Sequence, residues 1–151
     1  MEVRVKLYVV LVFLCTLTKS FSQDTTEVVR DYIETDLRNY AFCRCLEHSP
    51  DSVALKSFLH DKDGSAAGYF NVLPIGYEEF FMLDSLASAK PREVFYPSKY
   101  NSTLTLMKCL DFYNGQELRD SVRAIVGRFD AEELNDKDLY ERAMSKKNNW
   151  K

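Results

Sequence analysis

The sequence predicts an all-α fold, a single compact helical domain of about five to seven helices. Three observations predict it. Apolar residues recur at intervals of three and four along most of the chain, as they do on one face of an α-helix. Helix-capping and helix-breaking residues lie between these stretches. No internal repeat and no flexible linker divides the chain further.

The N-terminal segment is typical of a secretory signal peptide. Arg4 and Lys6 precede an apolar run over residues 7–17, and a polar stretch follows. The run is about 11 residues long, whereas a membrane-spanning helix needs about 20, so we expect no lasting membrane anchor. Small residues at Ser20 and Ser22 predict cleavage after Ser22, which makes residues 1–22 the signal peptide and residues 23–151 the helical domain.

Cleavage would leave 129 residues with a net charge of −5, because the removed segment holds three basic residues and one acidic residue. A chain of this length can bury about two-thirds of its unfolded surface, which is enough for a core. Phosphates require clustered positive charge, and no stripe of Lys or Arg is present, so we expect no nucleic-acid partner.

The first helix of the domain is expected to open at Asp24, with Glu27 completing a capping pair, and to stop near His48. One apolar face supports it: Val29, Ile33, Leu37 and Tyr40. Ser49 and Pro50 then suit the first positions of a new helix. Its apolar stripe reaches residue 73 with an interruption near Gly64.

A third helix is expected from Tyr77 to a stop before Lys90-Pro91. After a structured loop rich in prolines and aromatics, four residues fit one buried helix face: Leu106, Cys109, Leu110 and Tyr113. Asn114-Gly115 is expected to end that helix, because both residues tolerate a left-handed backbone. The cleanest helical period follows in Leu118, Val122, Ile125, Val126 and Phe129. Residues 127–151 form a charge-rich extension in which Asp130 and Glu133 suit a cap.

No catalytic, metal or cofactor site is expected. A cysteine nucleophile needs a base, and the only histidines are His48 and His60, at a helix end and on a charged surface. Zinc needs four ligands at suitable spacing, which Cys43-x-Cys45 and the distant Cys109 do not supply. Nucleophile elbows, phosphate loops and metalloprotease motifs are missing from the sequence.

Export would permit a disulfide, and Cys43, Cys45 and Cys109 remain after cleavage. Cys43 and Cys45 point about 200° apart on one helix, so they should not pair with each other. The apolar period of this helix leans slightly towards Cys43 as the buried cysteine. The choice between Cys43 and Cys45 as the partner of Cys109 therefore stays open at this point.

Four blocks of sequence resemble the fourth family of type VI secretion amidase immunity proteins. They are NYAFCRCL at residues 39–46, DGSAAGY at 63–69, YPSKY at 96–100 and LMKCLDFY at 106–113. The resemblance covers about residues 39–126, and MKCLD is its most specific element. It implies an all-helical, periplasmic and commonly dimeric protein that binds a toxic peptidoglycan amidase and blocks its active-site cleft. The chain would then be an inhibitor and not an enzyme.

The resemblance also assigns residues. The paired cysteines of the family map onto Cys45 and Cys109, with Cys43 as the alternative to Cys45. Relatives are implied to insert a protruding loop into the cleft of the amidase, and residues 94–101 form the best loop of this kind. The expected partner contacts are Phe95, Tyr96, Ser98, Lys99 and Tyr100. Aromatic side chains on a loop stiffened by proline suit a binding anchor, although they could instead cover the core.

Two other functions are compatible with the same sequence. One is an exported helical inhibitor or binding protein for another partner, such as a lysozyme-like enzyme. The other is a small hydrolase that uses one of the cysteines. The order of the four blocks favours the cognate amidase effector as the partner.

Overall fold

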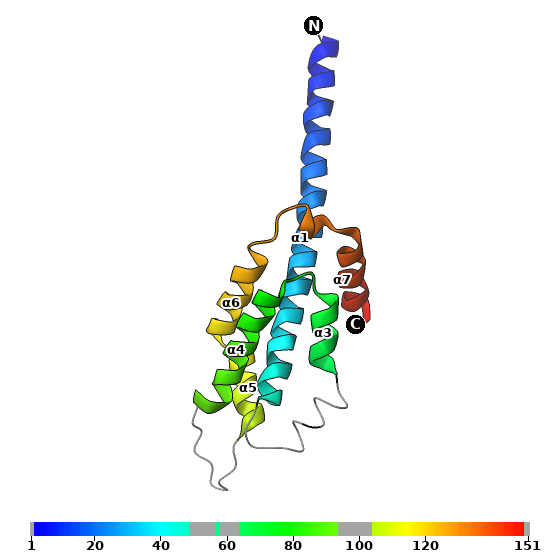
Figure 1. The fold of residues 1–151 in the computed structure, drawn as a ribbon. Coiled ribbons are helices and arrows are strands. Elements are labelled where there is room, and N and C mark those ends of the chain that lie inside the picture. The colour runs from blue at the N-terminus through cyan, green and yellow to red at the C-terminus, as the bar shows by residue number, and fades with distance from the viewer. Residues whose placement is uncertain (1, 49–56, 58–63, 94–103, 150–151) are drawn as a thin grey trace. The chain divides into compact units, whose positions relative to one another are not determined.

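The computed structural model describes residues 2–48, 57, 64–93 and 104–149, which Figure 1 draws as a ribbon. These residues form helices without any strand among them, so the predicted all-α class is confirmed. The elements are α1 (Glu2–Glu47), α3 (Ser65–Val72), α4 (Tyr77–Glu93), α5 (Thr105–Asn114), α6 (Gln116–Val126), the 3-10 turn η2 (Glu133–Asn135) and α7 (Lys137–Asn149). They divide into two compact units, Ile33–Arg128 and Met1–Tyr32 with Phe129–Lys151.

Helix α1 runs without a break from Glu2 to Glu47, so the expected start at Asp24 is wrong. The stretch before Asp24 contains neither proline nor glycine, and nothing in it stops a helix. The expected stop near His48 is confirmed, since the amide of His48 makes the last helical bond, 2.9 Å to the carbonyl oxygen of Arg44. None of the helices in the described ranges combines the length and the hydropathy needed to cross a membrane.

In the unit Ile33–Arg128, α3, α4, α5 and α6 lie around the C-terminal part of α1 (Figure 1). Helices α4 and α6 are antiparallel, because two ion pairs join opposite ends of them. Lys90 Nζ lies 2.6 Å from Glu117 at the start of α6, and Arg128 lies 3.0 Å from Glu79 at the start of α4. Helix α5 contacts both α4 and α6.

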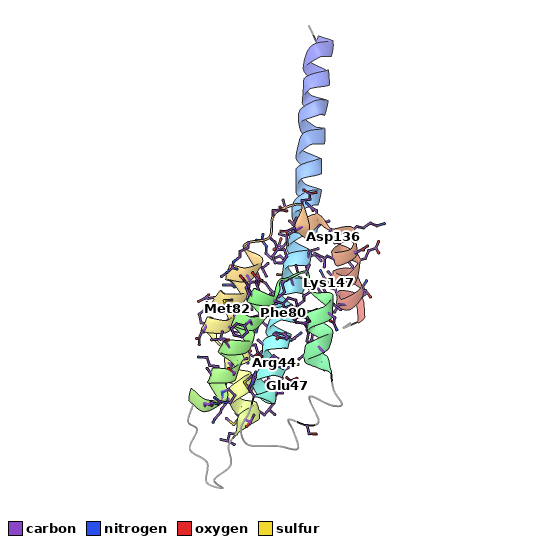
Figure 2. The ribbon with its side chains drawn as sticks, viewed as in Figure 1. Arg44, Glu47, Phe80, Met82, Asp136 and Lys147 are labelled. Atoms are coloured by element: carbon purple, nitrogen blue, oxygen red, sulfur yellow. A yellow bond between two sulfur atoms is a disulfide. The ribbon has the colours of Figure 1, made fainter. Side chains whose placement is uncertain are left out.

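An aromatic cluster fills the space where α3 and α4 face α1. The side chain of Phe80 is only 3% exposed and is labelled in Figure 2. Its ring centroid lies 4.8 Å from that of Tyr40 on α1 and 4.5 Å from that of Phe70 on α3. Edge-on and tilted aromatic pairs at such distances add to the free energy of burial.

Helix α4 passes the expected stop and continues through Pro91 to Glu93. A proline inside a helix removes one backbone hydrogen bond. Here it stands in the final turn of the helix, and its ring is fully buried. Its carbonyl oxygen accepts a hydrogen bond of 2.9 Å from Lys108 Nζ on α5. Burial and this bond offset the loss.

The expected buried face of α5 is partly wrong. Cys109 is buried as expected, but Phe112 accompanies it inside, while Leu106 and Leu110 are 57% and 42% exposed. Helix α5 ends at Asn114 as expected, yet Gly115 has an extended backbone with φ −70° and not a left-handed one. A Cβ atom at Gly115 would lie 3.1 Å from two carbonyl oxygens of the preceding turn, and this crowding explains the glycine. The predicted period of α6 is confirmed by its buried residues Leu118, Val122, Ile125 and Val126.

The other unit contains the first part of α1, η2 and α7. Asp130 and Glu133 form the expected cap, since Asp130 Oδ1 accepts a bond of 2.9 Å from the Glu133 amide and Glu133 Oε2 accepts one of 2.9 Å from the Asp130 amide. Thr25 on α1 donates a hydrogen bond of 3.3 Å to Asn135, and Lys146 on α7 lies 5.6 Å from the ring centroid of Tyr32. The extension is therefore a packed part of the protein.

Candidate functional site

The expected amidase contacts, Phe95, Tyr96, Ser98, Lys99 and Tyr100, lie outside the described residues. The two helices that flank them are described. Helix α4 ends at Glu93 and α5 starts at Thr105. The bond from Lys108 to the Pro91 carbonyl ties these two ends together. The end of α4 and the start of α5 are therefore held close together.

A disulfide joins Cys45 on α1 to Cys109 on α5, with the two Cα atoms 5.7 Å apart. This is the pairing that the resemblance implies. Both cysteines are fully buried, whereas Cys43 keeps its thiol and is half-buried. The apolar period slightly favours Cys43 as the buried cysteine, and this prediction is wrong. The buried residues of α1 recur every four positions, at Ile33, Leu37 and the small Ala41, and the next position is Cys45.

Arg38 on α1 holds the C-terminal end of α5. Its Nη2 atom donates a hydrogen bond of 2.9 Å to the carbonyl oxygen of Tyr113, and its guanidinium carbon lies 4.3 Å from the centroid of the Tyr113 ring. Phe42 meets the same ring edge-on at 5.8 Å. The cation, the ring contact and the disulfide together fix both the position and the rotation of α5 on α1.

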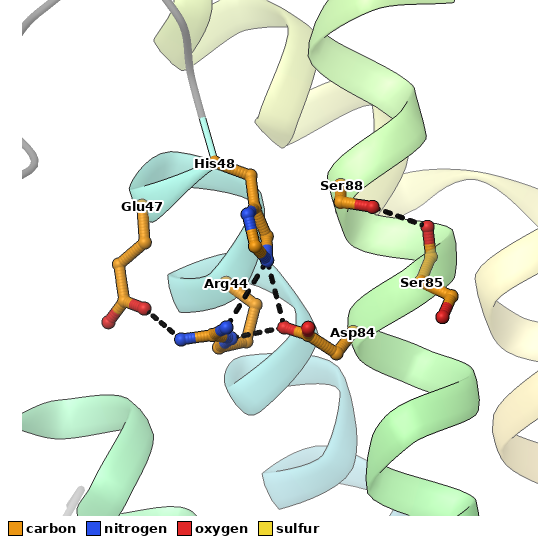
Figure 3. Close-up of polar contacts among 6 residues, drawn as sticks. All are labelled: Arg44, Glu47, His48, Asp84, Ser85 and Ser88. Carbon is orange, nitrogen blue, oxygen red and sulfur yellow. Dashed lines mark hydrogen bonds and ion pairs between the residues drawn. The ribbon is translucent and has the colours of Figure 1, made fainter.

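A polar network forms at the end of α1, where it faces α4 (Figure 3). Arg44 binds the carboxylate of Asp84 through Nε and that of Glu47 through Nη1. His48 Nε2 lies 3.0 Å from Asp84 Oδ1 and 3.2 Å from Arg44 Nη2. Two guanidinium nitrogens of Arg44 thus bind carboxylates, one on α1 and one on α4, and this side chain joins the two helices.

Electrostatics keep this network charged. Burial acts to raise the pKa of Asp84, but the hydrogen bonds from Arg44 and His48 outweigh it and hold the pKa below its ordinary value. Burial acts to lower the pKa of Arg44, but the bond to Asp84 and the charge of Glu47 raise it. The pair is therefore ionised at neutral pH.

The network contains an aspartate and a histidine in contact, two of the three groups of a serine-hydrolase triad. The hydroxyl of Ser88 on α4 donates to the carbonyl oxygen of Ser85 at 2.9 Å (Figure 3). It does not point its proton at the histidine. The arrangement of these residues serves to join α1 to α4.

The open pocket beside Arg44 has a volume of about 380 Å³. Its lining comes from α1, from α3 and from the residue that precedes α3: Tyr40, Arg44, Glu47, Gly64, Ala66, Ala67 and Phe70. Its two ionic groups, Arg44 and Glu47, bind each other. The walls of the pocket are thus mostly apolar, and the charges of its two ionic groups neutralise each other.

The network predicts a pH dependence of stability. The carboxyl of Asp84 has a lower pKa in the folded protein than its ordinary value of 3.8. The unfolded chain therefore takes up the proton first as the pH falls, and the contribution of the carboxylate is lost below that value. We expect the wild type to have a higher free energy of unfolding than Asp84→Asn. The difference should be largest at about pH 5 and should decrease towards about pH 2.5, as measured by urea unfolding.

The matched control is Asp138→Asn, which removes an exposed carboxylate from α7. Its free energy of unfolding should stay within about 0.5 kcal/mol of the wild-type value at both pH values. A gap for Asp84→Asn that is as large at the acidic end as at pH 5 would contradict the stabilising role of the Asp84 carboxylate.

Sequence reasoning missed two features of this unit. The first is the network of Arg44 and Asp84, whose only local signal is the spacing of four between Arg44 and His48 at a helix end. The second is the outward side of α5, on which Leu106, Met107 and Leu110 are exposed. Of these, Leu106 and Leu110 were expected to support the core.

The chain matches the Tai4 family, described as type VI secretion system (T6SS) amidase immunity protein, over residues 35–122. No curated protein and no solved structure matches the sequence. The matched residues are more than half of the chain and include both cysteines of the disulfide, Arg38, and the network of Arg44 and Asp84. This protein belongs to the Tai4 family of type VI secretion system amidase immunity proteins.

Proposed function

We propose that this protein is a periplasmic immunity protein that binds a cognate type VI secretion peptidoglycan amidase and occludes its active-site cleft, with no enzymatic activity of its own. The match to the Tai4 family over residues 35–122 is the observation that carries the proposal. A bound inhibitor protects the cell that makes it, or its neighbours, when the amidase is injected.

Two features support the periplasmic location. The first 22 residues have the charge and apolar pattern of a signal peptide. The disulfide between Cys45 and Cys109 suits an oxidising compartment. Cell fractionation should recover the protein in the periplasm, and its mass should correspond to a chain that starts at Gln23 or within two residues of it. Recovery of the uncleaved chain from the cytoplasm would contradict this.

The proposed contact surface is the segment that contains Tyr96 and Lys99. Its two flanking helices are held at their ends by the Lys108 bond to Pro91 and by the disulfide on α5. When both ends of a binding segment are fixed, the segment loses less conformational entropy on entering a cleft. Aromatic side chains on such a segment are suited to be the anchors of the interface.

We expect Tyr96→Ala to raise the inhibition constant for the cognate amidase by about 30-fold or more, since truncation of a central anchor costs about 2 kcal/mol or more. Lys99→Glu should raise it by about tenfold through reversed charge at the contact. Peptidoglycan hydrolysis by the amidase, titrated with each variant, measures both effects.

Lys137→Glu is the control, because it makes the same charge reversal on an exposed residue of α7. It should inhibit as wild type does. If Tyr96→Ala and Lys99→Glu are folded and inhibit as well as wild type, the assigned surface is wrong. Inhibition of a lysozyme-like enzyme in place of the amidase would favour the other class of partner. The homodimer that the resemblance implies stays a prediction that the mass of the purified protein tests.

A further inference from the structure

The outward side of α5 carries three large apolar side chains that the fold leaves in solvent. Leu106, Met107 and Leu110 are 57%, 49% and 42% exposed. Leu110 follows Met107 by three positions and Leu106 by four, so it is a neighbour of both on the helix surface. These three residues form the α5 patch. Large apolar side chains gathered on one face are typical of an interaction surface.

Contacts on the inner side of α5 keep this patch outside. The disulfide of Cys109 joins the middle of the helix to α1. At the end of the helix, Arg38 binds the carbonyl oxygen and the ring of Tyr113. Near its start, Lys108 Nζ donates to the carbonyl oxygen of Pro91 on α4. Because these contacts prevent α5 from turning about its axis, the exposure of the patch is a fixed property of the fold.

The patch is apolar and carries no charge of its own. The one basic residue of α5, Lys108, directs its ammonium group to the Pro91 carbonyl. The one acidic residue, Asp111, follows Leu110 at the edge of the patch. Nucleic acid binds through clustered positive charge, which this surface lacks. An apolar surface of a partner would gain the free energy of burial here.

The residue that precedes α5 has a strained backbone. Leu104 has φ 51° and ψ 34°, and it is the only described residue other than glycine with a positive φ. Leucine rarely adopts this left-handed conformation. Its carbonyl oxygen accepts a hydrogen bond of 3.1 Å from the Lys108 amide, which helps to hold it. Strained residues are concentrated at binding sites, and Leu104 stands in the chain between the proposed amidase contacts and the α5 patch.

The proposed contact segment is too short to form an interface by itself. Residues 94–101 are eight residues, whereas a standard interface takes about 20–30 residues and about 800 Å² from each partner. Most of the contact must therefore come from surfaces next to the segment, and the α5 patch begins five positions after residue 101. Tyr77 and Phe81 are also exposed, on the outward face of α4, but Phe81 stands 12 positions before Glu93, about 18 Å along the helix.

We propose that the α5 patch is a second contact surface for the cognate amidase. It packs on an apolar, uncharged rim of the amidase cleft while the segment that contains Tyr96 and Lys99 enters the cleft. The inference rests on the proposed immunity function and extends its interface. The flexible side chain of Met107 suits such a rim, because methionine adapts its shape to irregular apolar surfaces.

Two substitutions by lysine test this contact in the whole protein. Met107→Lys and Leu110→Lys should each raise the inhibition constant for the amidase about tenfold or more, because an unpaired charge would lose its water at an apolar contact. Both residues are exposed, so each variant should unfold at the same urea concentration as wild type. Met82→Lys is the matched control, because Met82 is a methionine of α4 that is 38% exposed (Figure 2). It should inhibit as wild type does.

The outcomes separate this inference from the proposed function. If wild type inhibits a type VI amidase and the two α5 variants inhibit it equally well, the α5 patch is not a contact surface and the immunity function stands. If wild type inhibits no such amidase, both fail. An equal loss of inhibition in Met82→Lys would show that the effect is not specific to α5, and it would overturn the inference.

Oxidation of the wild-type protein tests the same contact without a substitution. Hydrogen peroxide converts an exposed methionine to its sulfoxide, and mass spectrometry of tryptic peptides separates Met82 from Met107. Saturation with the amidase should slow oxidation of Met107 about tenfold and leave that of Met82 within about twofold of its rate in the free protein. Equal rates for Met107 with and without amidase would overturn the proposal. So would protection of Met107 in the free protein at high concentration, which would assign the patch to a second copy of the chain.

Discussion

Replacing Cys109 with serine should lower the free energy of unfolding by about 4 kcal/mol. The disulfide closes a loop across 64 positions, between α1 and α5. In the chain-entropy model, most of its effect comes from restricting the unfolded chain. Helix α5 has only 10 residues and would not be stable in isolation, so its attachment to α1 depends on this bond and on the packing around it. Urea unfolding of the oxidised protein measures the loss.

Cys43→Ser is the matched control, because Cys43 lies two residues from Cys45 on the same helix and keeps its thiol. It should change the free energy of unfolding by about 1 kcal/mol or less. Reduction of the wild-type protein should reproduce the effect of Cys109→Ser, and reduction should leave that variant unchanged. If an alkylating reagent modifies Cys45 and Cys109 in the protein purified without reductant, the bond is absent and the prediction fails.

The disulfide also shows which features of the fold could be predicted from the sequence. Helix α6 has one clear apolar face, and its four buried residues are those that the period indicates. Helix α5 is apolar or aromatic on most sides, so several rotations bury a similar area. The bond from Cys109 to Cys45 and the contact of Arg38 with Tyr113 select one of these rotations. Both depend on residues more than 60 positions away, which a local period does not include.

The contacts of the candidate site could not be predicted from a local sequence pattern either. Arg44 and Asp84 stand 40 positions apart, on two helices whose relative position the sequence pattern does not give. The selection of Tyr96 and Lys99 rests on the resemblance to a family and not on their local pattern. Composition and charge argue against a nucleic-acid partner, but the particular contacts within the fold follow from tertiary packing.

Replacing Phe80 with alanine should lower the free energy of unfolding by about 3–5 kcal/mol. Its side chain is 3% exposed, and its ring contacts Tyr40 on α1 and Phe70 on α3. Truncation leaves a cavity where three helices meet, and it also removes two aromatic contacts of about 0.5–1.5 kcal/mol each, which that range includes. Thermal and urea unfolding measure the loss of stability.

Phe81→Ala is the sharpest control for this prediction, because it makes the same truncation one residue along the same helix. Phe81 is 74% exposed, so its replacement should change the free energy of unfolding by about 0.5 kcal/mol or less. Equal destabilisation by the two variants would mean that α4 is rotated about its axis, and both the aromatic core and the outward face would then be wrong together.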